Sequence, residues 1–154
     1  MRMNKQNLDL GFVADEDVRT LLEDYHAQAA KAFEAGSYMG AIVGYGAVVE
    51  GLLTWALLQR KIEAMRSSKA TKDKQGNPRP LEEWNLSNLI EVCVELELIG
   101  TTASKASWAL KDFRNFIHPF NLLKKSARPD SALAASAASA FSEIRRSLEG
   151  RISQ

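Results

Sequence analysis

The sequence has few of the residues that build disulfides or metal sites. Its one cysteine, Cys93, lies in the apolar run Ile90 to Val94, so one chain can form neither a disulfide nor a thiolate zinc cluster. It has two histidines among 154 residues, which argues against a metal site. We therefore expect no cofactor and a reducing, cytoplasmic environment.

Export and membrane signals are also lacking. The stretch Met1 to Lys5 leads into acidic residues without the apolar block of a secretory signal, so we expect no export. The most apolar segment, Met39 to Leu58, is interrupted by glycines and one charge, which favours a buried core helix over a membrane span. These glycines also lack the strand, turn and lysine of a phosphate-binding loop, which excludes nucleotide hydrolysis of that type.

Positive and negative charges nearly balance over the whole chain but are unevenly distributed along it. The net charge of +1 provides no general attraction to nucleic acid. Between Lys105 and Arg128, however, six basic residues face one acid, Asp112, for a local charge of +5. The acids are concentrated instead between Asp9 and Glu34.

Apolar residues recur at helical spacing through most of the chain, and no strand-like alternation competes with them. We expect an all-α, single-domain bundle of four to five helices over residues 15–150, preceded by an irregular arm over 1–14. The expected helices span 15–36, 37–66, 87–98, 101–118 and 130–150, with an exposed loop over 67–85. Gly40 and Gly44 suggest that another backbone packs closely on the central helix.

The helix expected to end at His118 has two distinct faces. Leu110, Phe113 and Ile117 form an apolar line, while Ser107, Lys111, Arg114 and His118 form a polar one. Arg114 and His118, one turn apart, can then reach the same phosphate, the guanidinium as a bidentate donor and the imidazole as acid or base. The adjacent Asn115 adds a donor and an acceptor.

This region resembles the arginine-asparagine-histidine motif of the HEPN domain family. The matching residues run from Leu110 to Pro119, with Arg114, Asn115 and His118 in the positions of the motif. The segment Ala41 to Leu53, with Glu50 in an apolar setting, is similar to the family's second helix, and Asn88 to Ile99 to its third.

The resemblance implies a HEPN-like helical fold and a metal-independent endoribonuclease of toxin or defence type, acting at a cleft between two copies. Arg114 and Asn115 would hold the phosphate, and His118 would move protons. Glu50 and Lys111 would support them, and further RNA contacts would come from Lys105, Lys124, Lys125 and Arg128. Implied partners are RNA, a second copy and a cognate antitoxin or other protein, with no membrane.

Other interpretations of the same residues remain open. Three residues separate Arg114 from His118, fewer than in the usual family motif, so the site could bind or assemble without cleaving. Glu50 could equally be a structural ion-pair partner. His26 on its acidic helix favours a surface or packed role, and Trp55, Trp84 and Trp108 favour packing over base stacking.

Overall fold

The computed structural model describes residues 9–116, 118–125 and 128–152, and their regular structure is helical. Within these ranges the chain forms seven α-helices and one short 3-10 helix, η2. Their bounds are α1 (Glu16–Glu34), α2 (Tyr38–Leu58), α3 (Lys61–Arg66), η2 (Leu81–Glu83), α4 (Leu86–Glu95), α5 (Thr101–Phe116), α6 (Pro119–Lys125) and α7 (Ser131–Ile152). The all-α class is confirmed, and the helices outnumber the four to five expected.

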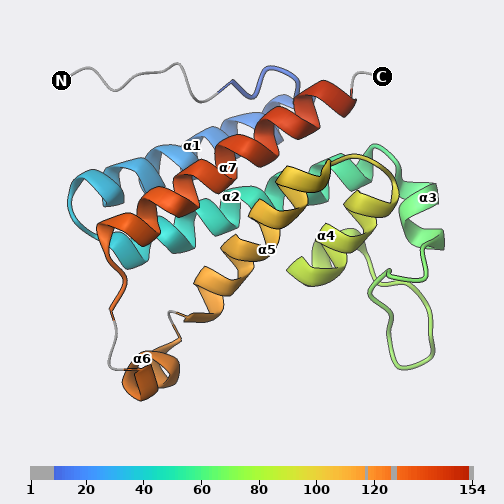
Figure 1. Ribbon diagram of the computed structural model, residues 1–154. Coiled ribbons are helices and arrows are strands. Elements are labelled where there is room, and N and C mark those ends of the chain that lie inside the picture. The colour runs from blue at the N-terminus through green and yellow to red at the C-terminus, as the bar shows by residue number, and fades with distance from the viewer. Residues whose placement is uncertain (1–8, 117, 126–127, 153–154) are drawn as a thin grey trace.

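Helix α2 is the centre of the bundle. Helices α1 and α7 lie along it, α5 crosses it obliquely, and α4 packs beside α5 (Figure 1). Eleven of its 21 residues are buried. Among the described helices it alone is long and apolar enough to span a membrane, but 61% of that apolar window is buried inside the fold. This burial fits the expected core helix.

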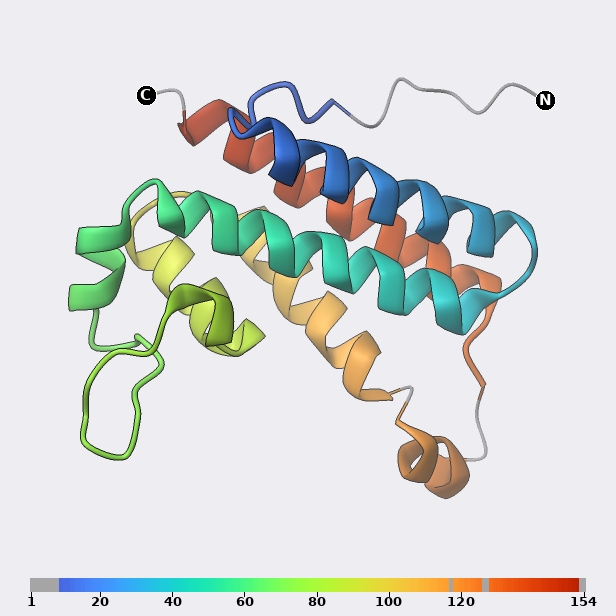
Figure 2. The ribbon, with the colours of Figure 1, turned by 180° about the vertical axis from the view of Figure 1, so that it is seen from behind.

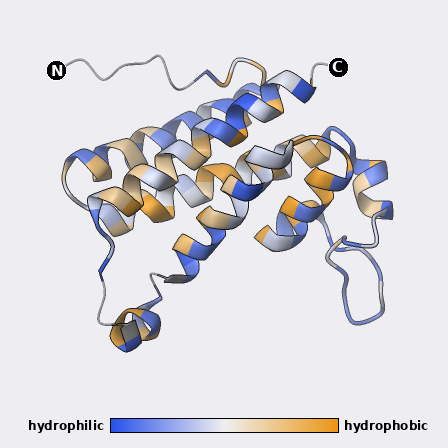
Figure 3. Ribbon diagram, in the orientation of Figure 1, coloured by the Kyte–Doolittle hydropathy of each residue, from blue (hydrophilic) through white to orange (hydrophobic). Residues whose placement is uncertain are grey.

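Apolar residues alternate with polar ones along the helices (Figure 3), and the buried apolar residues form one core cluster. The core includes Trp55 and Trp84, which confirms packing roles for these two rings, and Trp108 is half-buried against it. The indole nitrogen of Trp84 donates to the carbonyl of Arg79 at 2.8 Å, so its one polar atom is satisfied.

Both ends of α1 lie within two residues of the expected bounds, 15 and 36. Asp15 caps α1 by accepting a hydrogen bond from the Val18 amide at 3.0 Å. After α1, Gly36 adopts a φ of +76°, a left-handed conformation that costs glycine little and lets the chain reverse into α2.

The single helix expected over 37–66 is wrong, because the chain breaks between Leu58 and Lys61 into α2 and α3. The last carbonyls of α2 find other donors here. The Gln59 side chain donates to Trp55 O at 3.0 Å, and the Arg60 amide donates to Leu57 O at 2.9 Å. Since these bonds satisfy the helix end, no glycine or proline is needed to stop it.

Helix α4 ends at Glu95, earlier than expected, and Gly100 does not close it. Glu97 takes the left-handed conformation instead, with a φ of +59°, and the Leu98 amide donates back to Cys93 O at 2.8 Å. Gly100 donates to the Ser147 hydroxyl at 2.9 Å, which joins the α4–α5 connection to α7.

The segment 67–85 is only partly the exposed loop that was expected. Residues 74–80 are exposed, but Ala70, Leu81 and Trp84 are buried in the core. Ser67 donates to Glu95 at 2.6 Å, and this bond also ties the start of the segment to α4. The segment is therefore a loop with anchored ends.

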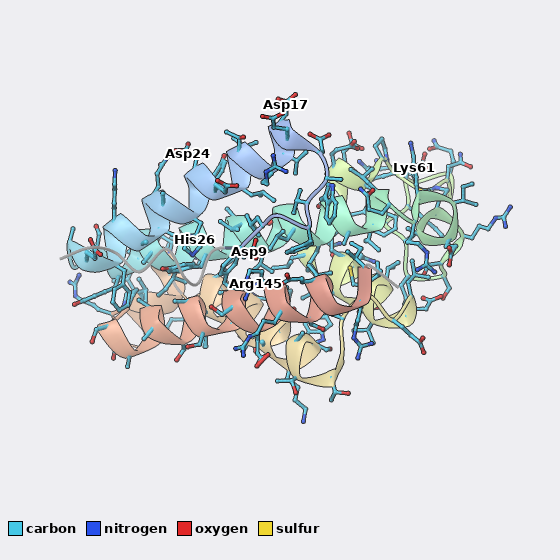
Figure 4. All side chains as sticks on the ribbon, turned by 90° about the horizontal axis from the view of Figure 1, so that it is seen from above. Asp9, Asp17, Asp24, His26, Lys61 and Arg145 are labelled. Carbon is cyan, nitrogen blue, oxygen red and sulfur yellow. The ribbon has the colours of Figure 1, made fainter. Side chains whose placement is uncertain are left out.

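The described part of the N-terminal arm, residues 9–14, is irregular as expected but belongs to the core. Leu10 and Val13 are buried, and Phe12 packs edge-to-face on Trp55 with ring centres 5.9 Å apart. Figure 4 shows Asp9 between α1 and α7 near Arg145, whose guanidinium donates to the Asp9 carbonyl at 3.5 Å. The arm therefore covers the seam between these two helices.

The close backbone contact suggested for α2 occurs at one glycine of the pair. A Cβ at Gly44 would lie 2.8 Å from Ala29 Cβ and 3.2 Å from its Cα, so α1 and α2 can approach only because Gly44 has no side chain. A Cβ at Gly40 would make an ordinary contact at 3.6 Å with Ala32.

Candidate functional site

The C-terminal half of α5 positions the candidate site beside α2. Leu110 is fully buried and fixes the inner side of the helix. Ser107 is buried too, with its hydroxyl donating to Ala103 O at 2.8 Å, so its expected place on an open polar line is wrong. A hydroxyl can return its hydrogen bond to the preceding turn, and burial of Ser107 then leaves no polar group unsatisfied.

Arg114 lies across α2 and forms an ion pair with Glu50. One guanidinium nitrogen is 2.8 Å from Glu50 Oε2, and the two side chains are 36% and 38% exposed. The aliphatic part of Arg114 passes directly over Gly46, where a Cβ would clash with Arg114 Cδ. Gly46 therefore opens the path by which the arginine reaches the glutamate.

A shallow depression of about 370 Å³ surrounds this ion pair. It is lined by Glu50, Asn85, Leu86, Lys111, Arg114 and Asn115. The ammonium group of Lys111 lies 5.8 Å from the centre of the Trp108 ring, an attractive cation–π arrangement. The depression thus combines a guanidinium, an ammonium group and two amides, the donors that bind a phosphate in proteins.

His118 lies outside this depression, and the helix expected to carry it is shorter than predicted. Helix α5 ends at Phe116. The His118 carbonyl accepts from the Leu122 amide at 3.0 Å, so His118 precedes α6 as its capping residue. Its Nδ1 accepts from the Phe120 amide at 3.3 Å, and its ring stacks on that of Phe120. The polar line therefore does not continue from Arg114 to His118 along one helix.

Pro119 explains this break. It lacks an amide hydrogen and disfavours helical backbone in the preceding residue, but it suits the first position of a new helix. Asn121 strengthens the junction, since its side chain donates to the Asn115 carbonyl at 2.8 Å, as the His118 amide does at 3.2 Å. The proline was expected only to stop α5, and the helix α6 that it begins was not foreseen.

Three of the four further expected RNA contacts do not line the depression. Lys105, Lys124 and Arg128 are exposed but are not among its residues. Ile117 and the side chain of Lys125 lie outside what the structure describes. The structure thus brings together Glu50, Lys111, Arg114 and Asn115. It leaves His118, Lys105, Lys124 and Arg128 apart from them.

Two residues of the site, Asn85 and Gly46, were not identified from the sequence. Asn85 caps α4 by accepting from the Asn88 amide at 2.9 Å, and the pattern of an asparagine before an apolar helix would have located this cap. No sequence signal could have shown that it faces Arg114. Gly46 could not be identified either, because its importance depends on the Arg114 side chain that crosses it.

Three titratable groups away from the depression are wholly or partly buried: His26, Tyr45 and Cys93. His26 lies between the rings of Tyr45 and Phe141, and burial lowers the pKa of its imidazole. This confirms a packed role. Burial likewise raises the pKa of Tyr45, with the Glu34 charge adding to the shift, and raises the pKa of Cys93. Across the residues that the structure describes, no cluster of three metal-ligating side chains occurs.

Comparison of the chain with protein-family models, with curated proteins and with solved structures found no match.

Proposed function

We propose that this chain is a HEPN-like RNA-targeting protein, a metal-independent endoribonuclease of toxin or defence type that acts as a homodimer. The observation that supports it best is the depression around Arg114, where cationic and amide donors gather beside a basic stretch of chain. Glu50 pairs with Arg114, and a phosphate would compete with this carboxylate for the guanidinium.

In the proposed reaction the ribose 2′-hydroxyl attacks the adjacent phosphorus. The bond from phosphorus to the 5′ oxygen breaks, so that one product ends in a 2′,3′-cyclic phosphate and the other in a 5′-hydroxyl. One proton leaves the attacking hydroxyl and one is added to the leaving oxygen. Arg114 and Asn115 would stabilise the phosphate charge, and His118 would transfer a proton through Nε2, because its Nδ1 already accepts from Phe120.

The direct test is incubation of purified protein with mixed-sequence RNA in excess chelator. We expect products with cyclic phosphate ends, and a loss of at least about a hundredfold in cleavage rate for Arg114→Ala and His118→Ala, the usual range for removing acid–base or charge-stabilising groups. Arg146→Ala is a matched control, since Arg146 is also an arginine paired with a glutamate, Glu143, on an exposed surface. A wild type that leaves varied RNAs intact would refute the cleavage.

A second candidate is a non-catalytic helical binding or assembly module. It is favoured by the separation of His118 from the depression and by the use of its Nδ1 in capping α6. Under this alternative RNA or a protein partner binds without being cut. Retention of labelled RNA by the wild type, weakened in Arg114→Ala and unaffected in His118→Ala, with no product formed, would support it.

A further inference from the structure

The short helix α6 exposes two large apolar side chains. Phe120 is 68% exposed and Leu123 is 73% exposed. Because they are three positions apart they share one face of α6, and we call them the α6 knob. Figure 1 shows α6 projecting from the end of α5, its main contact within the fold, so that the rest of the bundle does not cover the knob.

An apolar groove of about 490 Å³ runs between α1 and α2 on another part of the surface. Its most exposed apolar residues are Leu21, Tyr25 and Leu58, which are 56%, 45% and 37% exposed. We call it the α1/α2 groove, and its other lining residues are Val18, Leu22, Ala47, Glu50, Gly51, Thr54, Trp55 and Glu82. A groove of this size accommodates a large apolar side chain.

The α6 knob does not fill the groove of its own chain. The groove lies along the half of α2 that leads to α3, whereas Figures 1 and 2 both place α6 beyond the far end of α5. A contact between the two surfaces therefore requires two molecules.

The charges around the two surfaces are opposite. Helix α1 carries five acids and two bases besides His26, and Figure 4 shows two of the acids, Asp17 and Asp24, on the side of α1 away from α7. Leu21 lies four residues after Asp17 and three before Asp24, so the three share a helix face. Near the knob, by contrast, the sequence from Pro119 to Pro129 has three bases and no acid. Opposite charges around apolar centres favour association and fix its orientation.

We propose that the α6 knob of one copy docks in the α1/α2 groove of a second copy, and that the second copy returns the same contact. Such a reciprocal pair has two-fold symmetry and closes as a dimer. The inference rests on the homodimer of the proposed function, whose contact surfaces it specifies, but not on its chemistry.

The docking also explains how the separated residues of the motif could come together. Glu50 lines both the groove and the depression around Arg114. His118 stacks on Phe120 with ring centres 6.1 Å apart, so a docked Phe120 would bring the second copy's His118 to the groove that Glu50 helps to line. The dimer would then complete a site that one chain leaves divided.

Disulfide trapping between two differently tagged variants tests the contact. Cys93 is buried, so it provides little background. We expect Leu123→Cys mixed with Leu21→Cys to form a mixed disulfide at least about tenfold faster than Leu123→Cys mixed with Lys61→Cys, a control at an exposed position on α3. Equal rates for the two mixtures would overturn the proposal.

Sedimentation of the unmodified chain provides the second readout. We expect a species of twice the 17.0 kDa chain mass. Phe120→Asp with Leu123→Asp should weaken the dimer by at least about tenfold, as loss of a central apolar anchor does. Ile62→Asp should not, although Ile62 is 70% exposed on α3. Unchanged helical circular dichroism would show that the variants fold.

The docking and the chemistry can fail separately. A wild type that stays monomeric at all concentrations, or that dimerises equally well without the knob, refutes the docking even if it cleaves RNA. A chain that passes the trapping test but leaves RNA intact retains the docking and refutes the nuclease.

Discussion

Helices α6 and α7 carry similar apolar residues, but those of α7 are buried and those of α6 are exposed. In α7, Phe141, Ile144 and Leu148 are buried against the rest of the bundle, whereas in α6 Phe120 and Leu123 face solvent. Helix α7 packs along α2 and α5 over its length, and α6 touches mainly the end of α5. Apolar spacing therefore shows which side chains share a face, but not whether the same chain covers that face.

The largest effect expected from this difference is on stability. Phe141→Ala should lower the free energy of unfolding by about 3–5 kcal/mol, because it removes a ring packed on His26 and Tyr45 and leaves a cavity. Phe120→Ala should change it by less than about 0.5 kcal/mol in dilute protein. Urea unfolding at low concentration measures both, and equal losses would mean that α6 is covered after all.

A smaller effect should separate two glycines of α2. Gly44→Ala should destabilise the fold by about 1–3 kcal/mol, because its Cβ would press on the Ala29 backbone of α1. Gly40→Ala has room and should stabilise by up to about 1 kcal/mol through better helix propensity. Thermal unfolding of the two variants should show shifts of opposite sign.

The packed imidazole of His26 should make stability depend on pH. Burial lowers the pKa of the imidazole in the folded state. At a pH below the ordinary pKa of 6.5, the unfolded chain therefore binds a proton more readily than the folded chain does. Stability should therefore fall as the pH drops below 6.5, until the folded imidazole titrates as well. Chemical unfolding of wild type and His26→Gln between pH 5 and 8 checks this, and parallel curves would contradict it.

A change at the candidate site should have only a small effect on stability. Glu50→Gln should cost less than about 1 kcal/mol, since both members of its ion pair with Arg114 are partly exposed. It should instead raise RNA affinity, because the Glu50 carboxylate would no longer compete with a phosphate for the Arg114 guanidinium. Denaturation and RNA binding measured on one preparation separate the two, and Glu143→Gln, which releases Arg146, is the control.

Gly46→Ala would show whether the path of Arg114 matters. The added methyl would clash with the flexible end of this side chain rather than with backbone, so stability should change little. We expect the added methyl to push Arg114 out of the depression and RNA affinity to fall severalfold, whereas Gly40→Ala should leave RNA affinity unchanged.

Local chemistry in the sequence was enough to predict the helical class, the approximate ends of α1 and the buried α2, because apolar periodicity acts over a few residues. The resemblance to the HEPN family suggested Glu50 and Arg114 as candidates for one site, the first on an apolar helix and the second on a basic one. The sequence could not join Asn85 or Gly46 to them, since these meet only where α2, α4 and α5 cross.

Tertiary structure decided the rest. Where helix ends found other hydrogen-bond donors, as at Gln59, or a left-handed residue without glycine, as at Glu97, the expected boundaries moved. The chain direction after Phe116 took His118 out of the line of Arg114. A one-dimensional pattern specifies spacing within a helix, whereas the position of one helix against another depends on contacts between residues distant in sequence.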